Sequence, residues 1–229
     1  MNSSRLAGHM DVLGSIPQLH RTAVLDQCQQ RTYQRGDALW NQGDLAGSVG
    51  FLIKGKAMST YLSPGGKVGI TGFWSDGDIL GAADLGGFEK RQMTVRFLET
   101  SALHTMSISN FYDTLEKFPD MSKQVVRALS VRLRWVADLA LALETDSTED
   151  RIRGILVALT ESFGLQREDG WMIDLKLTHE DLASMVGVSR QMANGVLNKL
   201  KNKGFIALGK RKIVVTDLEL LRSSGGMAV

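Results

Sequence analysis

Cysteine is nearly absent from this sequence, and two kinds of targeting signal are missing. Cys28 is the single cysteine among 229 residues, which excludes an internal disulfide and leaves no thiolate set for an iron–sulfur cluster. The sequence contains no run of about 18 apolar residues, as a transmembrane helix requires. Its N-terminal residues lack the basic segment followed by an apolar segment that is typical of a secretory signal. We therefore expect a cytoplasmic protein without a membrane partner.

Short catalytic motifs are missing as well. The sequence has no Walker-type glycine-rich loop, no His-Glu-x-x-His pair and no nucleophile elbow. These motifs would place a phosphate, a metal or an activated serine, so their absence gives no support to catalysis. We expect a protein that is not an enzyme.

Acidic residues are scarce in one part of the chain. The net charge is +2, but residues 151–229 hold 12 Lys or Arg against 8 Asp or Glu, whereas residues 1–150 hold 15 against 17. Residues 182–216 contain seven cations and no acid. The C-terminal third is therefore suited to meet a polyanion.

Residues 177–206, LTHEDLASMVGVSRQMANGVLNKLKNKGFI, carry the clearest local pattern. Thr178 and Ser189 stand at N-cap positions, Asp181 completes a capping box with Thr178, and Gly187 and Gly204 stand where turns are expected. Apolar residues follow helical spacing on both sides of Gly187: Leu182, Ala183 and Val186, then Ala193, Val196, Leu197 and Leu200. The pattern predicts a helix-turn-helix.

The second of these helices presents side chains that suit base edges. Arginine can pair with guanine O6 and N7, and Gln or Asn with adenine N6 and N7. A solvated polar face is the alternative reading. We predict base contacts from Arg190, Gln191, Asn194 and Gly195. The missing side chain of the glycine either permits close approach of the backbone to DNA or reflects simple sequence drift. We predict phosphate contacts from Thr178, His179, Ser189, Lys199, Lys210, Arg211 and Lys212.

A basic hairpin follows the two helices. Residues 205–208 and 213–215 read as strands, and residues 209–212, Gly-Lys-Arg-Lys, read as the turn between them. A helix-turn-helix followed by such a hairpin is a winged helix-turn-helix, whose wing tip reaches DNA phosphate.

These segments resemble the DNA-binding end of the CRP/FNR family of bacterial transcription regulators. The resemblance continues from Pro17 to the C-terminal end and covers more than nine tenths of the chain. It implies a homodimer that binds a double-stranded DNA operator and acts with RNA polymerase. The implied fold is α+β, with an N-terminal β-roll sensor, a long dimerisation helix and a C-terminal winged helix-turn-helix.

The N-terminal half fits a β-roll. Residues 36–87 hold 13 of the 24 glycines, between short runs rich in Val, Ile, Phe and Tyr. Short strands separated by glycine turns predict a sandwich or jelly roll. The segments FLIKGK and GDILG, residues 51–56 and 77–81, resemble signatures of the cyclic-nucleotide-binding roll. We place this sensor domain at residues 17–117, with a helix from Pro17 to Cys28 at its start.

Residues 118–144 read as one long helix. Apolar residues recur at alternating spacings of three and four, as in the seam of a two-stranded coiled coil: Val126, Leu129, Leu133, Val136, Ala140 and Leu143. Arg132 and Arg134 flank the seam, which the resemblance identifies as the dimer interface. We read the polar stretch at residues 144–150 as a hinge and place the winged domain at residues 148–229.

The effector site departs from the family pattern. Cyclic-nucleotide-binding members have Gly-Glu-Leu followed by Arg-Ser-Ala, where this chain has Gly81-Ala82-Ala83 and Arg91-Gln92-Met93. The arginine is kept, so an anionic or nucleotide-like effector remains open. The glutamate is lost, and the purine-facing hydroxyls align with Val136 and Ala137. A pocket stripped of these partners should bind a cyclic nucleotide poorly.

The effector's identity stays open. Haem would need an axial ligand, for which His20, Cys28, His104 and Met106 are the candidates. Cys28 as a redox switch is less favoured, because no basic neighbour in sequence lowers its pKa. The alternative to DNA-binding regulation is a small-ligand or cyclic-nucleotide-binding module whose winged helix contacts protein.

Overall fold

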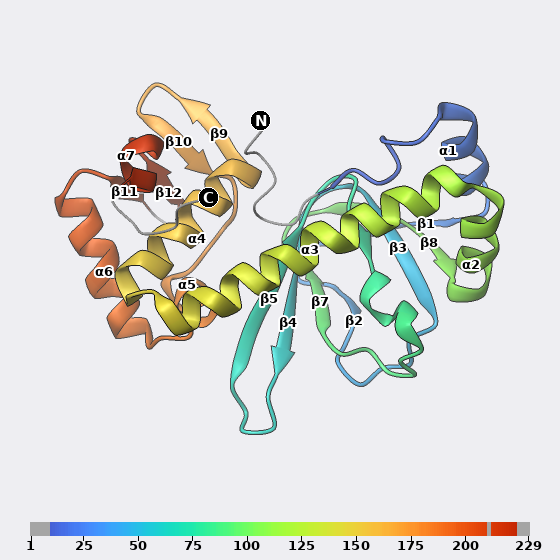
Figure 1. The fold of residues 1–229 in the computed structure, drawn as a ribbon, viewed down its shortest axis with the longest axis horizontal. Coiled ribbons are helices and arrows are strands. Elements are labelled where there is room, and N and C mark those ends of the chain that lie inside the picture. The colour runs from blue at the N-terminus through green and yellow to red at the C-terminus, as the bar shows by residue number, and fades with distance from the viewer. Residues whose placement is uncertain (1–9, 210–211, 224–229) are drawn as a thin grey trace. The chain divides into compact units, whose positions relative to one another are not determined.

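The computed structural model describes residues 10–209 and 212–223. They form two compact units, and the division falls between Leu133 and Arg134, inside one long helix (Figure 1). No helix in the described part of the chain combines the length and the apolarity needed to cross a membrane. Each unit is described separately below.

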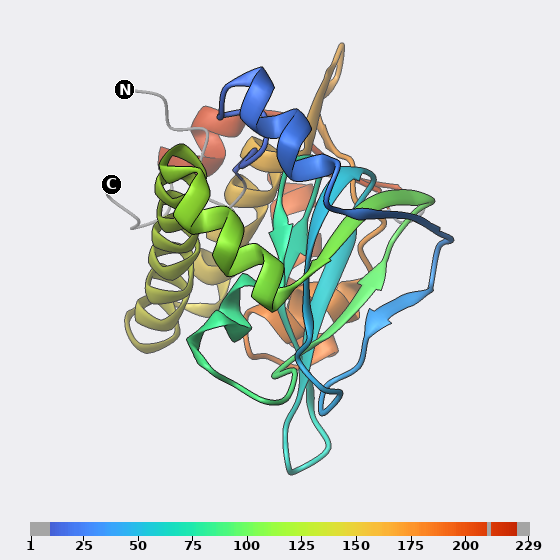
Figure 2. The ribbon, with the colours of Figure 1, turned by 90° about the vertical axis from the view of Figure 1, so that its right-hand side faces the viewer.

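The first unit is built on two antiparallel four-stranded sheets. Their orders are β1-β8-β3-β6 and β2-β7-β4-β5. The strands are β1 (Gln29–Tyr33), β2 (Ala38–Trp40), β3 (Ser48–Lys54), β4 (Ala57–Leu62), β5 (Val68–Trp74), β6 (Ile79–Leu80), β7 (Thr94–Phe97) and β8 (Ser101–Ser107). The β4–β5 hairpin extends beyond the other strands of the roll (Figure 2). The predicted α+β fold with an N-terminal β-roll is confirmed.

Alternating inward residues of these strands form the core of the roll. Leu52, Leu80, Phe97 and Leu103 are buried together in one cluster. A second cluster joins the outer side of the roll to its helices and includes Phe51 and Phe111 and the start of the long helix. The helices of this unit are α1 (Gln18–Leu25), the short η1 (Ala82–Gly86), α2 (Ile108–Lys117) and the first half of α3 (Pro119–Thr145).

Helix α3 leaves the predicted seam in solvent. The helix begins and ends within one residue of the predicted range, 118–144. Val126 and Leu133 expose 62% and 70% of their surface, and Leu129, Val136 and Leu143 are also exposed. The polar stretch 144–150, read from sequence as a hinge, is mostly helical, because α3 continues to Thr145 and the next helix begins at Thr148.

The second unit places four helices, one of them short, around a four-stranded sheet. Its elements are α4 (Thr148–Phe163), β9 (Gly164–Arg167), β10 (Gly170–Ile173), α5 (His179–Met185), α6 (Arg190–Asn202), β11 (Ile206–Gly209), β12 (Lys212–Val215) and the short α7 (Leu218–Ser223). The strand order is β11-β12-β10-β9, all antiparallel. The wing hairpin is thus continued by β9 and β10, which the sequence reasoning did not predict.

Helices α5 and α6 form the predicted helix-turn-helix. The Thr178 hydroxyl accepts from the backbone N–H of Asp181 and closes a capping box, and Ser189 Oγ accepts from the N–H of Met192. Gly187 lies in the turn with φ +69°, a conformation that strains other residues. Leu182, Ala183, Val186, Ala193, Leu197 and Leu200 of the two apolar runs are buried, while Val196 is half-buried.

Candidate functional site

The exposed face of α6 presents the predicted base-reading residues. Arg190 and Gln191 are exposed in its first turn, which Ser189 caps. Asn194 is half-buried, and its Oδ1 lies in hydrogen-bonding contact with His179 Nδ1 of α5. Gly195 is exposed, and a Cβ added to it would meet nothing within 4 Å. The helix therefore offers an unobstructed surface around this glycine.

Sequence reasoning missed one residue on this face. Met192 lies between the predicted base readers and exposes 52% of its surface. An apolar side chain can contact a thymine methyl group. Met192 directly precedes Ala193, which belongs to the buried apolar run, and this neighbouring position could have indicated that the Met192 side chain faces away from the core.

Lys199 is already engaged in an ion pair within the protein. Its Nζ pairs with the Glu149 carboxylate at the start of α4, and Lys203 Nζ lies 3.3 Å from the same group. The hydrogen bond from Lys199 is the main reason that the pKa of Glu149 lies below its usual range. DNA phosphate would have to compete with Glu149 for Lys199.

The other predicted phosphate contacts are placed as follows. Thr178 is exposed and His179 is half-buried, but the Thr178 hydroxyl is already used in the capping box. Lys212 is exposed at the start of β12. Lys210 and Arg211, at the wing tip, lie outside the described residues.

A cavity opens in the β-roll unit beside α3. Its empty space measures about 640 Å³, open mouth included. Gly81, Ala82 and Ala83, three of the residues proposed from the family pattern for the effector pocket, line it. The lining also includes Trp40, Ser59, Trp74, Asp78, Ile79, Leu80, Asp84, Met93, Val95, Ala128, Leu129 and Arg132.

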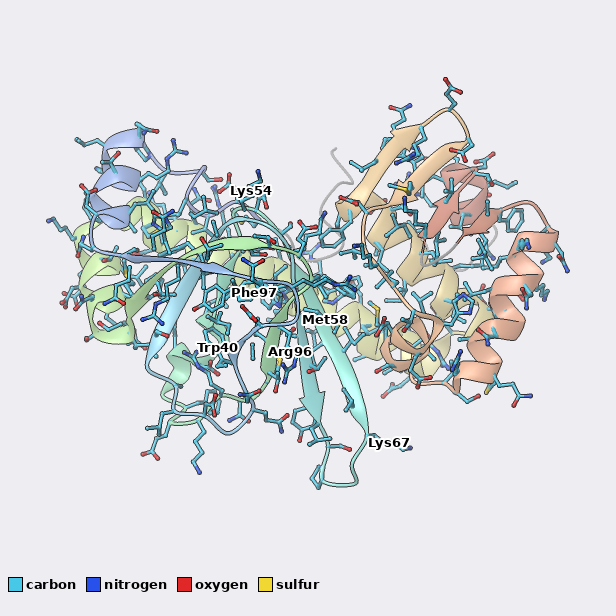
Figure 3. The ribbon with its side chains drawn as sticks, turned by 180° about the vertical axis from the view of Figure 1, so that it is seen from behind. Trp40, Lys54, Met58, Lys67, Arg96 and Phe97 are labelled. Carbon is cyan, nitrogen blue, oxygen red and sulfur yellow. The ribbon has the colours of Figure 1, made fainter. Side chains whose placement is uncertain are left out.

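Arg91 is engaged inside the protein. Its Nη1 donates to Asp84 over 2.7 Å, and its Nη2 donates to the Ser48 carbonyl over 2.6 Å. The guanidinium lies 3.6 Å from the centre of the Trp40 ring, which Figure 3 labels on the roll. Arg91 and Asp84 expose only 2% and 6% of their surface. The arginine that the resemblance reserved for an anion has its charge matched by Asp84.

Gly81 makes room for this arrangement. It adopts φ +84°, and a Cβ there would come within 2.8 Å of Arg91 Nη1 and 3.0 Å of the Ser48 carbonyl. A larger residue would displace the buried arginine, in addition to the strain of a left-handed backbone.

Several predicted pocket residues lie elsewhere. Arg91 and Gln92 are not among the residues that line the cavity, and Gln92 is exposed. From α3 the lining takes Ala128, Leu129 and Arg132, whereas Val136 and Ala137 are exposed further along the helix. Arg132, which flanks the predicted dimer seam, stacks on Trp74 of β5, with its guanidinium carbon 3.8 Å from the ring centre.

Three of the four candidate haem ligands are held in structural contacts, whereas His104 Nδ1 is shielded from solvent without a hydrogen-bond partner among the described residues. His20 Nδ1 lies 3.4 Å from an Asp120 oxygen, and Met106 is buried in the core. Cys28 donates to the Val24 carbonyl, and burial raises its pKa to about 11, which keeps the thiol protonated at neutral pH. Within the described ranges, no three His, Cys, Asp or Glu side chains are grouped to hold a metal ion.

Two family profiles match the two units. The cyclic nucleotide-binding domain profile matches residues 30–118, and the Crp-like helix-turn-helix domain profile matches residues 150–224.

Known regulators align with most of the chain. The transcriptional activator protein anr of Pseudomonas aeruginosa is 24% identical over 198 residues, which cover 86% of this chain and 80% of that protein. The CRP-like cAMP-activated global transcriptional regulator of Mycobacterium tuberculosis is 25% identical over 203 residues, which cover 87% and 89%.

Solved structures share the fold. The c-di-GMP responsive global regulator CLP of Xanthomonas campestris superposes with a TM-score of 0.78 at 22% identity, covering 88% of this chain and 100% of that one. A CooA mutant from Carboxydothermus hydrogenoformans superposes with a TM-score of 0.76 at 21% identity, covering 98% and 97%.

Proposed function

The chain belongs to the CRP/FNR family of transcription regulators, and from this premise we propose that it binds a pseudo-palindromic operator as a homodimer under the control of an effector at the β-roll. RNA polymerase is the further partner that we propose, and the cytoplasm is the compartment. The proposed domains are the sensor at residues 17–117, the dimerisation helix at 118–144 and the winged domain at 148–229.

The observation that carries the proposal is the division of α6 into two faces. Ala193, Leu197 and Leu200 are fully buried, so the helix is fixed on the unit by its apolar side. The opposite side exposes Arg190 and Gln191 in a segment without acidic residues. A fixed helix with arginine and amide groups outward has the form that enters a major groove and reads base edges.

The exposed seam of α3 supports the dimer. A row of large aliphatic side chains in water is unfavourable, and pairing with an identical helix removes it from solvent. Leu133, with 70% of its surface exposed, is the residue most changed by such pairing. A two-fold dimer would also match the two-fold symmetry of a palindromic operator.

The cavity supports control by an effector, but its chemistry does not suit a cyclic nucleotide. Ala82 supplies no acid for a ribose hydroxyl, and Arg91 is paired with Asp84. We therefore propose that the effector is not cyclic AMP. A small ligand reaching Leu129 would touch a residue of the dimer seam and thereby influence the pairing of the two chains.

Selection from a random library of duplexes tests the proposed function. Enriched sequences should contain two half-sites related by two-fold symmetry, with centres about one helical turn, or 34–36 Å, apart. Binding should weaken steeply with salt, because each neutralised phosphate contributes about 0.9 to the logarithmic slope. Arg190→Ala with the exposed Lys176→Ala as control separates base reading from loss of charge.

The rival function is a ligand-binding module whose winged helix contacts protein. That function predicts no enriched sequence and no measurable affinity for duplex DNA at physiological salt. A selection without an enriched sequence, or a binding assay without measurable duplex affinity, would favour the ligand-binding module over operator binding.

A further inference from the structure

Arg132 is a half-buried cation whose guanidinium has unused donors. Its Nη2 donates to the Phe73 carbonyl over 3.2 Å, and its guanidinium stacks on Trp74. Its Nε and Nη1 are shielded from solvent and have no hydrogen-bond partner. Burial lowers the pKa of Arg132, an effect that the Asp78 carboxylate partly opposes. Buried donors without acceptors are costly, so their presence at a cavity points to an acceptor that a guest would bring.

No protein carboxylate supplies that acceptor. Within the described part of the chain, no ion pair involves Arg132. Two acids line the same cavity, but both are engaged. Asp84 accepts from Arg91, and Asp78 accepts from the backbone N–H groups of Met10 and Ser75.

The rest of the lining favours a flat apolar guest. Trp40 and Trp74 come from the β2 and β5 strands, Met93 and Val95 add apolar side chains, and Ala128 and Leu129 close the helix side; all belong to the cavity lining. Indole rings and a methionine sulfur favour contact with an aromatic ring. Few polar groups are available for a sugar or a purine.

We propose that this cavity binds a small aromatic carboxylate, with its ring against the tryptophan-lined wall and its carboxylate on the guanidinium of Arg132. The inference rests on the effector control proposed above and names the ligand class. The family pattern would place the anion-binding arginine on the roll, at Arg91, but Asp84 neutralises that residue. In this chain the anion-binding arginine would therefore be Arg132 on the long helix. Arg132 lies three residues after Leu129 and one before Leu133, so the carboxylate would act directly on the helix of the dimer seam.

Matched ligands test the charge requirement on the unaltered protein. Phenylacetate, indole-3-acetate, phenylacetamide, phenethylamine and acetate are titrated by calorimetry into the full-length dimer. The two aromatic carboxylates should bind at least about tenfold more tightly than phenylacetamide, because a charge-assisted contact to the Arg132 guanidinium is lost in the amide. Acetate should bind no better than the amide, because it lacks the ring.

Variants then test the residue. Arg132→Gln should weaken phenylacetate binding by about ten- to a hundredfold while phenylacetamide binding is unchanged. Arg132→Lys should retain part of the affinity, and the exposed neighbour Arg134→Gln should bind as the unaltered protein does. Equal binding of phenylacetate and phenylacetamide, tighter binding of phenethylamine, or full carboxylate affinity in Arg132→Gln would each overturn the inference.

Operator affinity, measured in parallel, separates this inference from the proposed function. Carboxylate binding that depends on Arg132 but leaves operator affinity unchanged supports the site and overturns effector control. Intact operator binding without any carboxylate binding overturns the site and leaves DNA recognition standing.

Discussion

Arg91 and Asp84 form a buried ion pair inside the β-roll, with Nη1 of the arginine 2.7 Å from a carboxylate oxygen. The pair is closed by the Ser48 carbonyl and by the Trp40 ring beneath the guanidinium. An anion could bind Arg91 only by displacing the Asp84 carboxylate, which is already buried and hydrogen-bonded to the guanidinium. The retained family arginine is therefore a structural group in this chain.

The first prediction concerns cyclic nucleotides. Cyclic AMP and cyclic GMP titrated into the dimer should show no micromolar binding, because Asp84 occupies Arg91 and Ala82 offers no acid to the ribose. Calorimetry measures the binding, and operator affinity is read in parallel. Micromolar binding that raises operator affinity and disappears in Arg91→Ala would restore the ordinary cyclic-nucleotide mechanism.

The second prediction concerns the stability of the pair. Asp84→Ala should lower the free energy of unfolding by about 3–5 kcal/mol, because it leaves a buried arginine uncompensated. The double variant Asp84→Leu with Arg91→Met should lose much less, because neither charge remains. Urea unfolding compares them; if the single and double variants lose the same stability, the pair has no special role.

The third prediction separates base reading from phosphate contact. Arg190→Ala should relax base choice at one position in each half-site, at a cost of about 1–3 kcal/mol. Lys212→Ala should weaken all sequences alike and reduce the salt slope by about one. Competition between operator variants measures both effects. A uniform loss in Arg190→Ala, with the preferred sequence unchanged, would contradict base reading by Arg190.

The fourth prediction concerns Glu149 and its two lysines. The lowered pKa of Glu149 in the folded state means that its ion pairs stabilise the fold at neutral pH and stop doing so as the carboxylate is protonated in acid. Glu149→Gln should therefore be slightly less stable than the unaltered protein at pH 7, by about 0.2–1 kcal/mol for exposed pairs. The two proteins should become equally stable only when the pH falls below the lowered pKa of Glu149 in the folded state.

The same change should affect DNA binding in the opposite direction. Glu149→Gln releases Lys199 and Lys203, so operator affinity should rise, by up to about fivefold. Lys199→Gln is the matched control, because it removes the released charge. Weaker binding in Glu149→Gln would mean that the carboxylate positions the lysines for DNA instead of competing with it.

Local signals made the helix-turn-helix predictable. Thr178 and Ser189 cap the helices that begin one residue later, and Gly187 forms the turn between those helices. These contacts are local in sequence and can be predicted from residue type. The strands β9 and β10 were missed, because four residues carry too little alternation to be distinguished from a loop. Their pairing with the wing is a tertiary effect.

The ligand cavity was less predictable, because its decisive contacts join distant parts of the chain. The spacing of apolar residues along α3 predicted the exposed seam. It could not predict the contact of Arg132 with Trp74, because Trp74 lies on another element, β5. Asp84 lies seven residues before Arg91, but the two residues do not belong to one helix or one strand. Only the folded roll reveals that Asp84 pairs with Arg91, whereas Nε and Nη1 of Arg132 have no hydrogen-bond partner in the described part of the chain.

The central claim is a two-fold dimer that reads DNA through α6, and the stoichiometry of the operator complex tests it most directly. Sedimentation of the protein on a selected duplex at micromolar concentration should give two chains per duplex. Leu133→Glu should reduce this to a weak complex of one chain, whereas Arg134→Gln should not. A single unaltered chain bound tightly to the duplex would contradict the account.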